Sequence, residues 1–126
     1  MADSKTLEAK RKALEKETMT LQDIRKEQAT LIATRQTLDS QLQENELVEK
    51  EFGQLKDDAR IYKMVGPVLV PQEKGESVAN VQKRLEYIRG EIKRVDGRVE
   101  KLSADQQTLS MNAYKLQMEI QGMSKA

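Results

Sequence analysis

Apolar residues recur at alternating steps of three and four from Val78 to Met123, and this pattern constrains the fold of the chain more than any other. Residues at that spacing lie on one narrow stripe of an α-helix, and seven heptads of it are typical of a coiled coil. An amphipathic helix on a globular core would show a wider stripe over a shorter run. Stepping alternately by three and four gives fourteen positions, which we call the heptad frame of this segment, and thirteen of them are apolar. They are Val78, Val81, Leu85, Ile88, Ile92, Val95, Val99, Leu102, Gln106, Leu109, Ala113, Leu116, Ile120 and Met123. The second half of the chain is therefore predicted to be one helix of a coiled coil.

The first half of the chain repeats the pattern less regularly, with eight apolar residues in fourteen positions. Its frame reads Leu7, Lys10, Leu14, Glu17, Leu21, Ile24, Gln28, Leu31, Arg35, Leu38, Leu42, Asn45, Glu49 and Phe52. Two helices of nearly equal length with one short connection, 4–55 and 77–124, are expected to pair antiparallel. We predict a mainly α fold, a long antiparallel two-helix coiled coil, with both chain ends at the tip far from the connection.

Charge favours the same pairing. The segment Asp39–Glu51 carries five acidic residues against one lysine, and the segment Lys83–Lys101 carries seven basic residues against four acidic ones. Folding the chain back near residue 66 places these segments side by side, and opposite charges flanking a seam favour one orientation and register. The alternative is that the two segments are solvated helix faces that happen to differ in charge.

A short segment rich in β-formers, 60–71, separates the two helical patterns and reads "RIYKMVGPVLVP". Gly66-Pro67 marks a turn, because Gly admits a positive φ and Pro fixes its own φ. Pro71 is expected to end the second strand, and Ser77 is expected to be the N-cap of the second helix. We therefore predict one β-hairpin at the connection between the helices.

This hairpin is too small to be stable alone, because a two-stranded sheet is marginal in water and has two unpaired edges. Val68, Leu69 and Val70 are apolar on consecutive residues, so both faces of that strand require cover. We infer that other chains complete the sheet, whereas an extended linker lying across the helices is the alternative. The candidate residues for subunit assembly are Ile61, Tyr62, Met64, Val65, Val68, Leu69 and Val70.

Three motifs resemble the beta class of prefoldin subunits and are similar to those of the subunit 6 group within that class. They are "QLQENELVEKEF" (41–52), "IYKMVGPVLVPQEKGES" (61–77) and "KRLEYIRGEIKR" (83–94). The resemblance covers roughly 38–95 and fades into generic coiled coil toward both termini. On this resemblance, residues 1–126 are expected to form a single prefoldin beta-type domain.

The resemblance implies a hetero-hexamer of two alpha-class and four beta-class subunits, whose hairpins close into β-barrels that carry coiled-coil arms. It also implies an ATP-independent cochaperone that holds unfolded polypeptides, notably actin and tubulin, and passes them to the cytosolic group II chaperonin. The expected partners of this chain are therefore two alpha-class and three further beta-class subunits, unfolded clients and the chaperonin.

A second apolar stripe lies outside the seam frame. Met111, Tyr114 and Met118 occupy outward b and f positions of the heptad, and Met19 is an outward f position predicted to lie at the level of Met111. Methionine is unbranched and adapts to apolar partners of different shape, which suits a surface that holds many unfolded chains weakly. We predict that Met19, Met111, Tyr114, Met118 and Met123 contribute to client binding. The alternatives are ordinary exposed side chains or packing on a neighbouring arm.

Several function classes are excluded by what the sequence lacks. No Cys or His is present for thiol, Ser-His-Asp or His-metal chemistry, and the glycines do not form a phosphate-binding loop. Asp57 and Asp58 lie in a charged stretch, without the apolar surroundings that would raise the pKa of a carboxyl group and suit it to acid catalysis. A net charge of +1 and the absence of a long apolar run give no reason to expect nucleic acid or membrane binding.

We therefore expect no enzyme, catalytic residue, metal or cofactor, and a soluble cytoplasmic protein. The alternative to a client-holding subunit is a structural coiled-coil tether, although a tether has no need for sheet-forming residues at mid-chain. Two outward glycines, Gly90 and Gly97, are seven residues apart in the second helix, and either bending of the helix or the approach of another chain would explain them.

Overall fold

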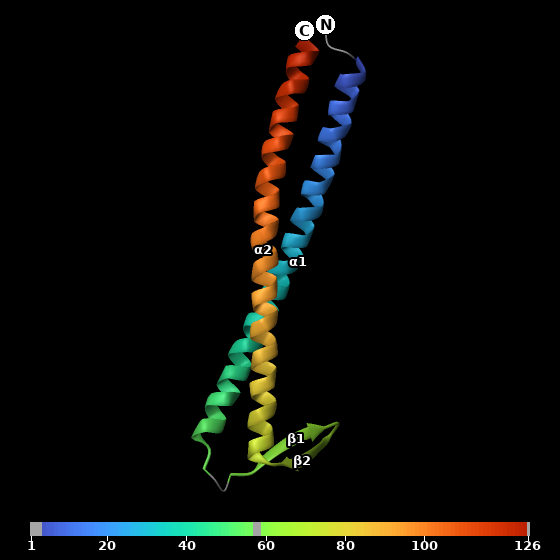
Figure 1. Ribbon diagram of the computed structural model, residues 1–126. Coiled ribbons are helices and arrows are strands. Elements are labelled where there is room, and N and C mark those ends of the chain that lie inside the picture. Colours follow the sequence, from blue (N-terminus) through green and yellow to red (C-terminus); the bar gives the residue numbers. More distant parts are fainter. Residues whose placement is uncertain (1–3, 57–58, 126) are drawn as a thin grey trace. The chain divides into compact units, whose positions relative to one another are not determined.

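The computed structural model describes residues 4–56 and 59–125. The elements are α1 (Ser4–Gln54), β1 (Ile61–Val65), β2 (Val68–Gln72) and α2 (Lys74–Lys125) (Figure 1). The predicted fold class, two long helices connected through one β-hairpin, is confirmed. The pair Asp57-Asp58 lies outside the described residues.

The chain divides into two compact units. The terminal unit comprises Met1–Ala33 and Asp96–Ala126, and the hairpin unit comprises Thr34–Val95. In the terminal unit Lys10 contacts Glu119 and Glu27 contacts Arg98, so residue numbers fall along α2 as they rise along α1. In the hairpin unit Glu46 contacts Arg89, and the Lys74 ammonium donates to the carbonyl of Leu55. The helices therefore pair antiparallel within each unit, as predicted.

The seam between the helices follows the two heptad frames. Every position of both frames is buried or half-buried, including the polar ones. The most buried apolar side chains are 0–8% exposed; they are Ile24 and Leu102 in the terminal unit, and Leu38, Val81, Leu85, Ile88 and Val95 in the hairpin unit. A 3–4 spacing thus places a single row of side chains from each helix against the other, which is the packing of a coiled coil.

Some polar residues in the α1 frame form hydrogen bonds, whereas Oε2 of Glu17 is buried without a partner among the described residues. The Gln28 amide donates to the side-chain oxygen of Gln106 across the seam at 2.9 Å, so two polar frame positions satisfy each other. Asn45 instead donates to the carbonyl of Gln41 on its own helix at 2.7 Å. These contacts explain how the seam tolerates Gln28, Gln106 and Asn45, because a buried polar group is costly mainly when it is unpaired.

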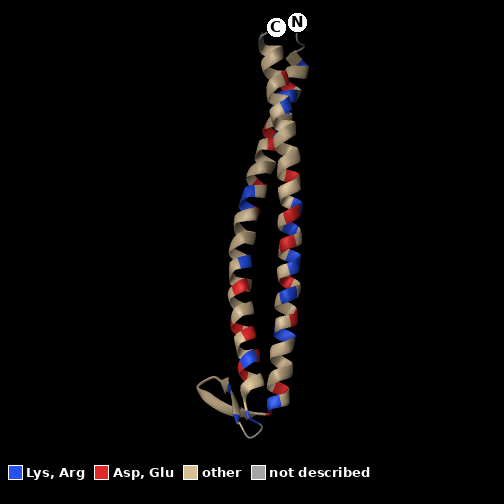
Figure 2. Ribbon diagram, turned by 90° about the vertical axis from the view of Figure 1, so that its left-hand side faces the viewer, with Lys and Arg blue, Asp and Glu red and all other residues tan. Residues whose placement is uncertain are grey.

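The predicted charge pairing is correct for only part of the basic segment. Acidic and basic residues are interleaved along both helices (Figure 2). Arg89 lies 3.5 Å from Glu46, as the facing segments require, but Arg94 pairs with Glu91 on its own helix. Arg98 pairs with Glu27, which lies outside Asp39–Glu51. The basic segment is longer than the part of α2 that lies level with the acidic segment, so its C-terminal end meets an earlier part of α1.

The hairpin closes on a two-residue turn. Val65 pairs with Val68, and the antiparallel register continues to Ile61 opposite Gln72. Gly66 has a φ of 58°, and Pro67 cannot adopt a positive φ. A positive φ at the first turn residue alone identifies a type II′ turn, whose twist matches that of the flanking strands.

Two predicted boundaries are wrong. Strand β2 continues through Pro71 to Gln72. In a hairpin with a two-residue turn, the cross-strand residue pairs alternate between hydrogen-bonded and non-hydrogen-bonded, starting from the hydrogen-bonded pair next to the turn. Tyr62 and Pro71 form a non-hydrogen-bonded pair, so the ladder requires no N–H from Pro71. Helix α2 begins at Lys74, and the Ser77 N–H already donates to the Glu73 carbonyl at 3.0 Å. Ser77 is therefore inside the first turns of the helix and is not its N-cap.

Candidate functional site

The β-hairpin presents apolar side chains on both of its faces. The register places Val65, Val68 and Val70 on one face, and Met64 and Leu69 on the other. Six of the seven residues predicted to mediate assembly are exposed, by 42–70%; they are Tyr62, Met64, Val65, Val68, Leu69 and Val70. The seventh, Ile61, is half-buried at the base of the hairpin. We call these seven residues the hairpin surface.

The outer edges of β1 and β2 carry no further strand in the described part of the chain. A pair of strands with open edges and two apolar faces leaves both main-chain hydrogen bonds and hydrophobic burial incomplete. The hairpin surface therefore has the properties of a fragment of a larger sheet.

A second apolar surface lies in the terminal unit. Met111, Tyr114 and Met118 are 50–66% exposed and share the outer side of α2; we call these three residues the methionine stripe. Met19 is also exposed, but the f positions of two paired helices point away from each other. Met19 therefore does not share a face with the methionine stripe. Met123 is half-buried at a seam position.

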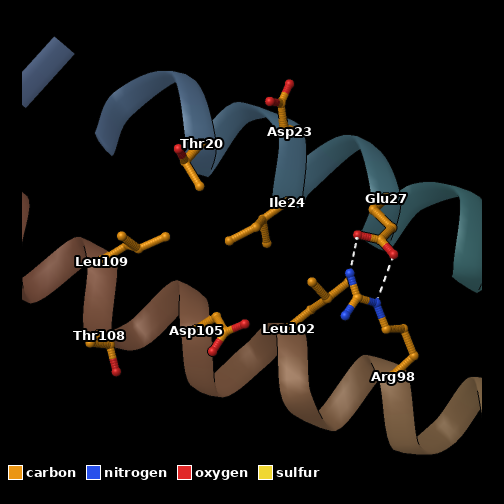
Figure 3. A pocket seen from close by; sticks show the side chains of 9 residues that line it. All are labelled: Thr20, Asp23, Ile24, Glu27, Arg98, Leu102, Asp105, Thr108 and Leu109. Carbon is orange, nitrogen blue, oxygen red and sulfur yellow. Dashed lines mark hydrogen bonds and ion pairs between the residues drawn. The ribbon is translucent and has the colours of Figure 1, made fainter. Parts of the chain in front are cut away.

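Between the helices of the terminal unit lies a groove of about 460 Å³ (Figure 3). Ile24, Leu102 and Leu109 form its apolar floor. Arg98 spans the groove and donates two hydrogen bonds to the carboxylate of Glu27, from Nε to Oε1 at 2.8 Å and from Nη2 to Oε2 at 3.0 Å. Such bidentate pairs have a fixed geometry as well as favourable charge.

The ion pair determines the chemistry of this groove. The hydrogen bond from Arg98 lowers the pKa of the Glu27 carboxyl, and the same contact raises the pKa of Arg98. The hydrogen bond from Lys10 likewise lowers the pKa of Glu119 near the chain termini. A carboxylate held ionised by a cation is a weak proton acceptor, so these groups serve to pair the helices and are poorly suited to general acid or base catalysis.

Among the described residues, no group of three or more His, Cys, Asp or Glu side chains is arranged to hold a metal ion. None of the described helices combines the length and apolar character that crossing a membrane requires.

Sequence reasoning missed some exposed apolar residues. Ile32, Leu47 and Tyr87 are 58–68% exposed. Leu47 and Tyr87 occupy outward f and c heptad positions, which would have revealed them, whereas Ile32 occupies an e position beside the seam. The buried hydroxyl of Ser77 was also missed, because the same residue type at the start of a helix is typical of an N-cap.

The amino-acid sequence matches the family model for prefoldin subunits over residues 15–120. It is 47% identical to prefoldin subunit 6 of Arabidopsis thaliana over 81 residues, which cover 64% of this chain and 63% of that protein. It is 39% identical to prefoldin subunit 6 of Saccharomyces cerevisiae, covering 75% of this chain and 83% of the other. The human prefoldin subunit 6 is 37% identical over 110 residues, covering 87% of this chain and 85% of the human one.

Solved structures share the fold. The prefoldin beta subunit from Thermococcus strain KS-1 superposes with a TM-score of 0.75 at 20% identity, covering 82% of this chain and 90% of that one. The beta2 subunit from the same strain superposes with a TM-score of 0.62 at 22% identity, covering 73% of this chain and 98% of that one. At these identities the likeness concerns the fold alone. The fold, the family match and the similar subunits agree: the chain belongs to the prefoldin subunit family, whose members are components of a chaperone complex.

Proposed function

We propose that this chain is a beta-class subunit of a hetero-hexameric prefoldin, together with two alpha-class and three further beta-class subunits. Its hairpin surface completes a β-barrel with strands from neighbouring subunits. The observation that carries this proposal is the exposure of apolar side chains on both faces of a hairpin with open edges. In an isolated chain these apolar side chains would stay in contact with water, which is unfavourable, and strands from neighbouring subunits would bury them and pair with the open edges.

The complex, in this proposal, holds unfolded polypeptides such as actin and tubulin without ATP, in the cytoplasm, and passes them to the group II chaperonin. The methionine stripe, with Met19 and Met123, supplies part of the client-binding surface. Methionine side chains adapt to differently shaped apolar partners, so one surface serves clients that share no sequence motif.

Weak contacts at several subunits are sufficient for capture. Once one subunit binds a segment of an unfolded chain, further segments meet the other subunits at a high effective concentration. Because each contact is weak, the client leaves when a competing chaperonin binds its segments one after another. The mechanism therefore requires apolar exposure and multiplicity, and it requires neither a nucleotide nor a covalent step.

The test is a reconstituted complex in which Met19, Met111, Met118 and Met123 of this chain are replaced by Gln. Native mass spectrometry should find the variant with five other prefoldin subunits, because the hairpin surface is unchanged. The variant complex should suppress aggregation of unfolded actin less effectively than the wild-type complex. A matched control, Ile32→Gln with Leu47→Gln, removes exposed apolar side chains elsewhere and should leave client holding unchanged.

The outcomes separate client holding from a structural role. Full client holding by the assembled methionine variant would contradict the role given to these residues. An assembled wild-type complex that holds no client would instead favour the structural coiled-coil tether. A chain that remains a monomer or a homodimer in the presence of the other subunits would contradict the proposal at its first step.

A further inference from the structure

A pocket of about 170 Å³ lies in the hairpin unit, where the end of α1, the base of the hairpin and the start of α2 meet. Its apolar wall is formed by Val48, Phe52 and Val81. A volume of roughly 10–15 Å³ suffices for one water molecule, so this pocket has room for a side chain. We call it the Ser77 pocket, after the most buried polar residue that lines it.

Ser77 is 5% exposed, and its hydroxyl has no hydrogen-bond partner in the described part of the chain. The hydroxyl does not cap α2, because the Ser77 backbone lies inside the helix. Burial of a hydroxyl without a partner is unfavourable, and native proteins almost always supply one. The orphaned hydroxyl therefore indicates that a polar atom from outside the described residues belongs in this pocket.

The other polar side chains identify the kind of atom that is missing. Lys63 from β1 and Arg84 from α2 line the pocket, and neither has an ion-pair partner among the described residues. No described Asp or Glu lines it. The hydroxyl of Ser77 can also donate. The amide side chains of Gln72 and Asn80 line the pocket and offer both donors and acceptors, so what the described lining lacks is a negative charge to face its two cations. A carboxylate accepts hydrogen bonds on both oxygens and is the natural partner of such a set.

The pocket is continuous with the hairpin surface, since Ile61 and Tyr62 belong to both. We propose that the Ser77 pocket receives the carboxylate of an Asp or Glu side chain from a neighbouring prefoldin subunit. The carboxylate accepts from Lys63 on the hairpin and from Ser77 and Arg84 on α2. One inserted side chain therefore binds the hairpin and the helix together, and fixes the orientation of β1 and β2 when the sheet is completed.

The first test is zero-length cross-linking of the reconstituted complex with a carbodiimide, which joins an amine to a carboxylate in direct contact. Lys63 should become linked to an Asp or Glu of another subunit, identified by mass spectrometry. Lys83 is the control, because it is a neighbouring exposed lysine that does not line the pocket. A linkage of Lys63 to an acidic residue of its own chain, or no linkage above that of Lys83, would overturn the proposal.

The second test compares Arg84→Glu with Lys83→Glu, which make the same change of charge inside and outside the pocket. Each variant competes with the wild-type chain for a limiting amount of the other subunits, and native mass spectrometry measures the ratio incorporated. Arg84→Glu should be incorporated about tenfold less well, since like charges in a partly buried site repel strongly. Equal incorporation of the two variants, high or low, would contradict the pocket's role.

The inference rests on assembly of the chain with other prefoldin subunits and is independent of client holding. If the wild-type chain fails to assemble, the proposed function fails. If the wild-type chain assembles but Lys63 and Arg84 behave like Lys83, only the carboxylate contact fails.

Discussion

The carboxylate of Glu27 accepts two hydrogen bonds from one guanidinium, and this contact fixes how α1 and α2 pair in the terminal unit. A shift of either helix by one heptad would separate Arg98 from Glu27. The Gln28–Gln106 hydrogen bond lies close by and would be lost in the same shift. Polar contacts of this kind select one register among several that satisfy the apolar stripe equally well.

Replacing Glu27 by Gln should lower the midpoint of thermal unfolding at pH 7 by about 1–5 °C, because exposed ion pairs are screened by water and salt. Arg98 lowers the pKa of Glu27 in the folded chain. The stabilisation is therefore complete above the ordinary carboxyl range and is lost as pH falls through the lowered pKa. Circular dichroism of the full chain should show the difference at pH 7 and a smaller one in acid.

Glu15→Gln provides the control, since Glu15 is an exposed carboxylate on the same helix without an ion pair among the contacts described. It should change the midpoint little at either pH. A difference between Glu27→Gln and wild type that persists unchanged in strong acid would show that the charge of Glu27 is not what stabilises the pair.

Sequence reasoning identified the residues of the seam but did not identify these partners. A heptad frame states which face of each helix is buried, and both frames are correct at every position. It leaves the axial shift between the helices open, because an apolar stripe repeats every seven residues. Arg98 was therefore matched to the acidic segment Asp39–Glu51, whereas the register brings it to Glu27.

The hairpin depends on the conformation of its turn. Gly66 has a positive φ that residues with a Cβ rarely adopt, although a Cβ there would meet no atom of the chain within 4 Å. The cost of a substitution at this position therefore arises from the backbone and not from crowding.

Gly66→Ala should destabilise the hairpin by about 1–2 kcal/mol and reduce incorporation into the complex in a competition with the wild-type chain. Gly75→Ala is the matched control, because Gly75 lies in the first turn of α2 and its φ is not positive. The control should assemble as well as wild type or better. Equal incorporation of the two variants would contradict a requirement for this turn.

The two outward glycines of α2 allow a prediction about the helix. A Cβ at Gly90 or Gly97 would meet nothing within 4 Å, so alanine fits at both positions. The double variant should unfold at a higher temperature, since each replacement favours the helix by about 1 kcal/mol. A midpoint that does not rise would contradict the account of α2 as a regular helix through these positions. Loss of assembly in a more stable chain would show that another subunit approaches these glycines closely.

Element types were predictable from the sequence, and element ends were less so. The change from a 3–4 spacing to a run of β-formers around Gly66-Pro67 predicts helix, hairpin and helix in the right order. The end of β2 and the start of α2 were predicted incorrectly. Proline usually interrupts the hydrogen-bonded ladder of a sheet, and serine at the start of a helix is usually its N-cap, but neither rule applies here. Proline is tolerated in β2 where no ladder N–H is needed, and α2 begins before the residue that resembles a cap.

At the scale of the whole molecule, the described residues form no closed hydrophobic core. Within each of the two units the buried apolar side chains lie between the helices, and six apolar side chains of the hairpin are exposed. Membership of the prefoldin subunit family accounts for this, because a subunit of a complex completes its burial at the contacts with its neighbours. The Ser77 pocket was not predictable from the sequence, because it forms only where the end of α1, the base of the hairpin and the start of α2 meet.

The measurement that tests this account most directly is hydrogen exchange of the amides of Ile61–Val70, in the isolated chain at micromolar concentration and in the assembled complex. We expect rapid exchange in the isolated chain and strong protection in the complex, because strands from neighbouring subunits complete the sheet. If the isolated chain is monomeric and these amides are already protected from exchange to the same degree as in the complex, the hairpin is complete without partners and the account is wrong.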